Sequence, residues 1–330
     1  MSCPTSAVPC FRYFLPLALS AATAAVAQTS TAPRVILIAT GAETVARPLV
    51  ESFRQGMRDH GYKEDVNYRL EIRLGQGDPT VVPGLIRDAV ASRPAVLVVT
   101  GLAGARSARE ATNTIPVVVA TSSDLVDAGI VKSYARPGGN ITGLNDLADE
   151  LAVKRLELLK EAMANASRVA LLVDPEFPAT PKIERSVRAA ARTLGIEISR
   201  VDAKDPASLA LALDFVAASR PHALLMGGAS LNVVRAKEII ERMVAARVPV
   251  AHYWPGTAEM GALFSHQADI FYNFRRAAYY VDRILKGTKP GDLAIELPTR
   301  YELVVNKRTA KDLNVTFPAS FLLRADKVID

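Results

Sequence analysis

Residues 96–120 read VLVVTGLAGARSAREATNTIPVVVA and contain the pattern that decides the fold. Val96–Val99 and Pro116–Ala120 are continuous apolar runs with the length of buried strands, and we expect the segment between them, Gly101–Thr112, to be helical. Strands that are apolar on both faces and separated by helices are typical of a parallel sheet with helices on both sides. The stretch therefore predicts an α/β fold.

The same alternation extends in both directions along the chain. Before this stretch we expect strands at Val35–Ala39 and Val66–Leu74 and helices at Arg47–His60 and from Asp78 onward. After the loop Arg136-Pro137-Gly138-Gly139-Asn140, the strongest loop signal in the chain, the pattern restarts. The second set comprises helices at Glu150–Ala164, Ile183–Leu194, Leu209–Ala218 and Val233–Ala245, and strands at Val169–Val173, Ile196–Val201, His222–Met226 and Val248–Tyr253. Two doubly wound units of similar length predict two lobes.

Four more elements follow the second unit. They are a strand at Leu263–His266, a helix at Ile270–Lys286, a strand at Glu302–Val305 and a helix near Lys307–Leu313. Elements left over after two complete units indicate that the chain crosses between the lobes more than once.

The chain begins with a predicted export signal. An apolar stretch follows Phe11, and Ala25-Val26-Ala27 before Gln28 is the small-x-small pattern that signal peptidase cuts after. The alternative is a membrane anchor, but the stretch is shorter than the ~20 residues needed to span a bilayer. We therefore expect residues 1–27 to be a signal peptide and the mature chain to be soluble in the periplasm.

Composition narrows the chemistry of the mature chain. Both cysteines, Cys3 and Cys10, lie within the predicted leader, so no disulfide, thiolate metal site or cysteine nucleophile is expected after cleavage. The formal charge is +6, falls to +5 without Arg12, and is spread along the chain. The basic clusters typical of a nucleic-acid binder are missing, so we expect no nucleic-acid partner.

Enzyme and cofactor motifs are also missing from the sequence. It contains no P-loop, no G-x-G-x-x-G, no H-E-x-x-H and no G-x-S-x-G. Asp174-Pro175-Glu176 could act as paired carboxylates, but Asp-Pro after a strand is usually a turn and helix start. The four histidines are isolated from one another in sequence. We therefore expect no catalytic residues, no metal and no cofactor.

Open parallel sheets bind ligands beyond the carboxyl ends of their strands. The loops expected there carry glycines, which let a ligand approach the backbone, and small polar residues beside helix starts, which attract anions. Each such residue has an alternative role as a helix cap. The candidate ligand-binding residues are Gly41, Thr100, Gly101, Ser122, Ser123, Asp124, Asn145, Asp174, Glu176, Gly227, Ser230 and His266.

Asp124 leads to a specific hypothesis about the ligand. Donors around Thr100, Gly101, Ser122 and Ser123 would hold a carboxylate, and Asp124 would pair with an amino group. An amino-acid-like molecule is then the best candidate. The alternative is that Asp124 only caps the following turn.

Several stretches resemble the ABC-transporter substrate-binding family that includes tryptophan- and phenylalanine-binding periplasmic proteins. They are Ser52-Phe53-Arg54-Gln55-Gly56-Met57 with His60-Gly61-Tyr62, Ala135–Gly143, Lys154–Lys160, and the long run Arg275–Asp330 with Val281-Asp282-Arg283-Ile284-Leu285-Lys286-Gly287 and Leu322-Leu323-Arg324-Ala325-Asp326. The resemblance covers essentially the whole mature chain. It departs at Ser265-His266-Gln267-Ala268-Asp269, taken as the last strand of lobe 1, where His266 replaces an aromatic residue of the cleft.

The resemblance implies a type I periplasmic-binding fold with a three-crossing hinge and a ligand between the lobes. The crossings should fall near Leu144–Glu150, Trp254–Gly261 and Pro290–Leu297. Lobe 1 would comprise residues 28–146 and 261–290, and lobe 2 residues 147–260 and 291–330.

The function expected from these observations is a monomeric extracytoplasmic receptor that captures a small polar solute by hinge closure. Its partners would be that solute and an ABC permease in the inner membrane. Two alternatives remain: a periplasmic sensory protein that presents its closed form to a membrane kinase, and an exported hydrolytic enzyme. A sugar-responsive repressor of the same fold is excluded, because the leader occupies the place of its DNA-binding segment.

Overall fold

The computed structural model describes residues 1–2 and 32–330. Residues 3–27 of the predicted signal peptide, its cleavage site and both cysteines lie outside the described residues. Among the residues that were described, no helix combines the length and apolar character that a bilayer crossing requires.

The first half of the described chain forms a five-stranded parallel sheet in the order β2-β1-β3-β4-β5. Its strands are β1 (Arg34–Ala39), β2 (Arg69–Leu74), β3 (Val96–Thr100), β4 (Val117–Thr121) and β5 (Ile141–Gly143). Its helices are α1 (Glu43–Asp59), α2 (Val82–Ala91), α3 (Gly101–Ala111) and α9 (Ile270–Leu285), with short 3-10 turns η1 (Pro79–Val81) and η2 (Pro290–Asp292). We call this sheet and its helices lobe 1.

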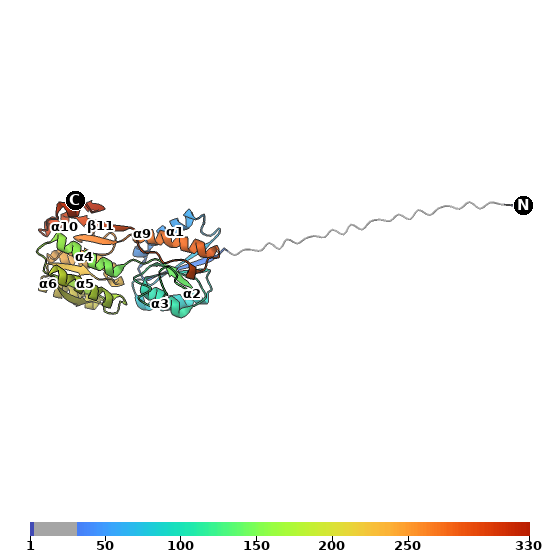
Figure 1. Cartoon of the computed structure of the whole chain (residues 1–330), viewed down its shortest axis with the longest axis horizontal. Helices are drawn as coiled ribbons and strands as arrows, with labels where there is room; N and C mark the ends of the chain where they lie inside the picture. Colours follow the sequence, from blue (N-terminus) through green and yellow to red (C-terminus); the bar gives the residue numbers. More distant parts are fainter. Residues whose placement is uncertain (3–31) are drawn as a thin grey trace. The chain divides into compact units, whose positions relative to one another are not determined.

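Both faces of this sheet are buried, as its continuous apolar strands predict. Val35, Leu37 and Phe53 belong to a core that α1 and α9 cover. Ile36 and Ile38, which point the other way along the same strand, belong to a second core under α2 and α3. Figure 1 shows α1 and α9 together on one side of this lobe and α2 and α3 on the other.

The second sheet has seven strands in the order β12-β11-β10-β9-β8-β6-β7, parallel except for the β10–β11 pair. Its strands are β6 (Arg168–Val173), β7 (Glu197–Asp202), β8 (Ala223–Met226), β9 (Val250–His252), β10 (Phe264–Ala268), β11 (Tyr301–Asn306) and β12 (Lys327–Ile329). Its helices are α4 (Ala148–Ala162), α5 (Thr180–Leu194), α6 (Pro206–Ser219), α7 (Ser230–Val234), α8 (Ala236–Ala245), α10 (Lys307–Asp312) and α11 (Ala319–Leu322). Helices again cover both faces, and we call this unit lobe 2.

Strand β10 corrects the expected division of the chain. We expected residues 261–290 in lobe 1, with a crossing near Trp254–Gly261. Instead, Phe264 pairs in parallel with Ala251 of β9 and antiparallel with Val305 of β11, inside the lobe 2 sheet. The crossing therefore follows β10, at Asp269, and β10 is no strand of lobe 1. All five residues of β10 are buried, and the strand connects β9 to β11 within the sheet.

The other two connections between the lobes lie side by side. The first follows β5 and leads through Asn145 to α4. The second runs from Glu296 to β11, later than the expected crossing at Pro290–Leu297, because Glu296 still pairs with Leu144 at the edge of lobe 1. The Asn145 amide donates to the Glu296 carbonyl (2.9 Å), and the Asp269 amide donates to the Arg300 carbonyl (3.0 Å). These bonds tie the connecting segments to one another.

Helices α1 and α9 approach unusually closely at Gly56. A Cβ atom placed there would lie 2.2 Å from the Arg275 carbonyl oxygen and 2.7 Å from the Ala278 Cβ. Both distances are well inside van der Waals contact, so the backbones pack at a spacing that only glycine permits. Gly56 stands in the Ser52–Met57 motif, and this packing gives that motif a structural role.

Candidate functional site

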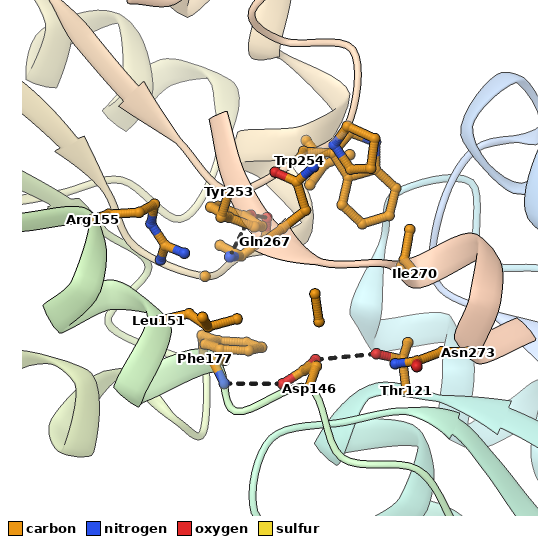
Figure 2. Close-up of a pocket in the computed structure, with 16 residues that line it drawn as sticks. Thr121, Asp146, Leu151, Arg155, Phe177, Tyr253, Trp254, Gln267, Ile270 and Asn273 are labelled. Carbon is orange, nitrogen blue, oxygen red and sulfur yellow. Dashed lines mark hydrogen bonds between the residues drawn. The ribbon is translucent and has the colours of Figure 1, made fainter. Parts of the chain in front are cut away.

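A cavity of about 200 Å³, which we call the cleft cavity, lies where elements of both lobes meet (Figure 2). It is lined by Thr121, Asp146, Ala148, Leu151, Arg155, Phe177, Gly228, Ala229, Val233, Tyr253, Trp254, Pro255, Gln267, Ala268, Ile270 and Asn273. Thr121 ends β4 and Ile270 begins α9 in lobe 1, whereas Tyr253 follows β9 in lobe 2. The cavity therefore lies at the carboxyl ends of strands, where open α/β sheets bind ligands.

Arg155 of α4 is a buried cation in the wall of this cavity. The side chain is only 3% exposed, one Nη donates to the His266 carbonyl (3.1 Å), and Nε has no hydrogen-bond partner. Burial lowers the pKa of the guanidinium to about 10, against the attraction of nearby Tyr253 and Asp146, so Arg155 is charged at neutral pH. No carboxylate of the described residues forms an ion pair with it. A buried charge without such a partner is costly, and an anionic ligand group would supply one.

Asp146 lies in the connection between β5 and α4. Its carboxylate accepts a hydrogen bond from the Thr121 hydroxyl (3.2 Å) and one from the Ala148 amide (3.1 Å), which fix its orientation in the cavity (Figure 2). A carboxylate is an acceptor-only group with about four acceptor positions. Asp146 and Arg155 together give the cavity one group of each charge.

Aromatic rings form the apolar part of the wall. Phe177 and Tyr253 come from the loops after β6 and β9, and Trp254 follows directly. The Tyr253 hydroxyl donates to the Ala229 carbonyl (2.6 Å) and accepts from the Ala229 amide (2.9 Å). The amides of Tyr253 and Trp254 donate to Nδ1 of His252, whose pKa burial lowers to about 3, so its neutral ring is the acceptor. These hydrogen bonds fix the Tyr253 ring, which also stacks on His252 with ring centroids 5.0 Å apart, and they anchor the backbone that carries Trp254.

Two amide side chains leave polar atoms unsatisfied in the same wall. Nε2 of Gln267 donates to Glu302 (2.8 Å), which leaves Oε1 as a buried acceptor without a partner. Nδ2 of Asn273, on a side chain only 2% exposed, is a buried donor without a partner. Unsatisfied buried groups are rare because each costs roughly 1–3 kcal/mol. The cleft cavity therefore offers an acceptor and a donor to a ligand.

A second cavity of about 160 Å³, the side cavity, adjoins the first. It is lined by Ala39, Thr40, Gly41, Val45, Ala46, Leu49, Thr100, Gly101, Thr121, Val233, Val234, Trp254, Ile270 and Phe274. Three residues expected to contact ligand, Gly41, Thr100 and Gly101, line this cavity and not the cleft cavity.

Asp124 and its neighbours lie outside both cavities. The Asp124 carboxylate accepts hydrogen bonds from the amides of Val126 (2.9 Å) and Asp127 (3.1 Å), as a turn cap does. These bonds favour the cap interpretation over the amino-group hypothesis. Ser122 and Ser123 are buried with unpartnered hydroxyls, but they line neither cavity because β4 ends at Thr121, one residue earlier.

Asn145 has a structural role in the connection that follows β5. Its Oδ1 accepts from the Leu147 amide (2.8 Å) and its Nδ2 donates to the Tyr134 hydroxyl (3.3 Å). Leu147 has a left-handed backbone (φ 50°), which is uncommon for a residue with a side chain. Asn145 thus stabilises a tight bend at the start of α4 and does not line the cavities.

Three candidates from the loops of lobe 2, Asp174, Glu176 and Gly227, also line neither cavity. Asp174 accepts from the Glu176 amide (2.8 Å), as expected of a turn, and exposed Glu176 forms an ion pair with Lys204 (2.8 Å). Gly227 and Ser230 flank Gly228 and Ala229, which do line the cleft cavity. This loop therefore contributes the two residues after Gly227 to the wall of the cleft cavity.

His266 is placed away from the cavities by the alternation of strand β10. Adjacent Gln267 faces the cleft cavity, whereas the His266 ring stacks on Tyr301 with ring centroids 6.3 Å apart. Burial, with the nearby charge of Arg155, lowers the pKa of His266 to about 4. The expectation that His266 replaces an aromatic cleft residue is not met by this geometry. Its carbonyl instead positions Arg155.

Comparisons with known proteins agree with this architecture. Residues 17–329 match the family described as ABC transporter substrate binding protein. A tyrosine-binding protein of Clostridioides difficile is 22% identical over 267 residues, which cover 80% of this chain and 76% of the relative.

Solved structures show the same fold. A conserved domain protein from Vibrio cholerae has a TM-score of 0.83 and 26% identity, covering 90% of this chain and 99% of that one. An ABC domain from Streptococcus pneumoniae in complex with L-Trp has a TM-score of 0.81 and 21% identity, covering 89% and 100%. The expectation of a type I periplasmic-binding fold is confirmed. With nearly its whole described length matched, the chain belongs to the ABC transporter substrate-binding protein family, whose members bind solutes and are not enzymes.

Proposed function

We propose that the protein is the extracytoplasmic receptor of an ABC importer and that it captures an amino acid between its lobes. The observation that carries this proposal is Arg155, a buried guanidinium without a carboxylate partner among the described residues, in a cavity that also contains Asp146. An arginine binds a carboxylate with paired hydrogen bonds, and an aspartate accepts from an ammonium group. The two groups of an amino acid match this pair of charges.

The remainder of the cavity suits the rest of such a ligand. Phe177, Tyr253 and Trp254 provide aromatic faces, which also attract cations and stack with rings. Relatives named for binding tyrosine and L-Trp support an amino acid as the ligand. Residues 1–27 would direct the chain to the periplasm, where the loaded receptor would deliver its ligand to a permease in the inner membrane.

Hinge closure would be the mechanism of capture. Ligand contacts to Thr121 and Asn273 of lobe 1 and to Arg155 of lobe 2 can form together only when the lobes are closed. A ligand that binds the closed form better shifts the population toward it. Lys182 of α5 supports closure directly, because it reaches across to Asp127 (2.5 Å) and Asp124 (3.5 Å) of lobe 1.

A thermal-shift screen of amino acids, small carboxylates, nucleosides and sugars tests the proposed function. A ligand at 100 times its dissociation constant adds about 2.7 kcal/mol to stability, which raises the midpoint by several degrees. We expect one or more L-amino acids to produce this shift and the corresponding amino alcohols, which lack the carboxylate, to produce none. A shift with sugars or nucleosides alone would contradict the amino-acid proposal.

Lys182→Met is expected to weaken ligand binding without removing any ligand contact. Partly exposed ion pairs contribute little each, so we expect about a two- to fivefold rise in the dissociation constant, largest at low salt. The matched control is Lys204→Met, which removes an ion pair with Glu176 inside lobe 2. Calorimetric titration at low and high salt measures both variants. Equal effects of the two substitutions would show that the Lys182 bridge does not contribute to closure.

A further inference from the structure

The side cavity continues the cleft cavity at the end away from Arg155. The two share Thr121, Val233, Trp254 and Ile270 in their linings. Figure 2 shows Thr121, Trp254 and Ile270 at the opposite side of the cleft cavity from Arg155. A ligand whose carboxylate lies at Arg155 would therefore direct its other end toward this shared wall.

The side cavity has a different chemistry from the cleft cavity. No charged side chain of the described chain lines it, and most of its wall is aliphatic or aromatic, including Val45, Leu49 and Phe274. The threonines at its edge are the polar side chains there. Water needs two to four polar partners to occupy a cavity, so an apolar group fits this space better than water does.

Glycines that follow two strands keep the side cavity open, because they have no side chain to fill it. At Gly41, after β1, an added Cβ would meet only Val45, at an ordinary contact distance of 3.5 Å. At Gly101, after β3, it would meet no atom within 4 Å. The backbone of Gly41 does not require glycine, since its φ lies outside the left-handed region. The effect of glycine at this position is therefore to leave space in the side cavity. It is not needed to relieve backbone strain.

We propose that the side cavity is a size-selective subsite and that Gly41 is its specificity-determining residue. The inference rests on the proposed function, and it assigns the side cavity to the apolar side chain of the bound amino acid. Trp254 forms the wall that this side chain must pass. Amino acids with a ring or a long alkyl chain fill the subsite, whereas alanine leaves it empty.

Filling the subsite tests the proposal. Trp254 is the only tryptophan in the chain, so its fluorescence reports occupancy of either cavity directly. We titrate wild type and Gly41→Leu with L-phenylalanine, L-leucine and L-alanine, and confirm the constants by calorimetry. We expect Gly41→Leu to raise the dissociation constant of L-phenylalanine at least about tenfold and to change that of L-alanine by no more than about twofold. A single group that does not fit a pocket reduces affinity by this factor or more.

Val45→Phe is the second variant, because its side chain starts from another point of the same wall, in the first turn of α1. Gly84→Leu is the control, because Gly84 lies in α2 and lines neither cavity. Thermal midpoints verify that the variants fold. The same selective loss in Gly41→Leu or Val45→Phe, and none in Gly84→Leu, supports the subsite.

Two results would overturn the proposal, and they are distinguishable. The subsite assignment is wrong, while the proposed function stands, if folded subsite variants bind L-phenylalanine with wild-type affinity. The same holds if they lose affinity for L-phenylalanine and L-alanine equally. If wild type itself binds no amino acid, the proposed function fails and the subsite assignment fails with it.

Discussion

Arg155→Met is expected to reduce the affinity for the amino acid found by the thermal screen by about 2–5 kcal/mol, or roughly 30-fold to several-thousand-fold. The substitution removes the cation that the ligand carboxylate would pair with, and leaves that carboxylate buried without a partner. Methionine approximates the length and flexibility of the arginine stem, so the apolar part of the side chain is largely kept. Calorimetric titration measures the loss.

The stability of the ligand-free protein separates a binding role from a structural one. The wild-type guanidinium is buried, with a hydrogen bond to the His266 carbonyl and its carbon Cζ 5.6 Å from the centre of the Tyr253 ring. These contacts compensate only part of its desolvation, so we expect the thermal midpoint of Arg155→Met to stay the same or rise. Arg155→Lys, which keeps the charge but loses the fork of donors, should bind with intermediate affinity. Unchanged binding, or a large fall in the midpoint, would exclude the proposed role.

Gly56→Ala is expected to lower the free energy of unfolding by about 1–3 kcal/mol, the cost of overpacking a core. Two effects of opposite sign compete at this position. Alanine favours a helix over glycine by about 1 kcal/mol. However, the new methyl would lie 2.2 Å from the Arg275 carbonyl oxygen, a rigid backbone atom of α9, so the helices must separate. We expect the steric clash to outweigh the gain in helix propensity. The thermal midpoint should then fall by about 2–4 °C for each kcal/mol of lost stability.

Gly84→Ala makes the same chemical change in a helix without the clash. The nearest atom to its added Cβ is the flexible Arg87 Nη2 at 3.9 Å. We expect this variant to be more stable than wild type, by up to about 1 kcal/mol. Denaturant titration of both variants gives the comparison. A Gly56→Ala variant as stable as Gly84→Ala would show that α1 and α9 tolerate a wider spacing.

Local sequence predicts the elements of the fold well because the central strands are apolar on both faces. Val96–Thr100 and Val117–Thr121 lie where the opening stretch predicts them. The assignment of strands to lobes is harder. Strand Phe264–Ala268 carries no local signal for the sheet it joins, since that choice depends on its partners Val250–His252 and Tyr301–Asn306, the latter far along the chain.

The site is less predictable because it is assembled from distant segments. The loops at strand ends were expected to form it, and several do, but which residue of a loop faces inward depends on where the strand ends. Arg155 had one usable signal: it lies four residues after Leu151 in the apolar stripe of a helix, and a charge there needs a reason. The sequence contains no comparable signal for Trp254, because the position of its side chain depends on the bend after β9.

The placement of α9 has a consequence for biosynthesis. Lobe 1 needs Phe274 and Tyr280 of this helix to cover one face of its sheet, and lobe 2 needs β11 and β12 from the end of the chain. During synthesis lobe 1 cannot close its core before α9 (Ile270–Leu285) has emerged from the ribosome, and lobe 2 cannot complete its sheet before β11 and β12 have emerged. Domains normally fold during synthesis as each is completed, N-terminal first. Here the discontinuous path of the chain delays the completion of both lobes, so neither can follow the usual N-terminal-first order.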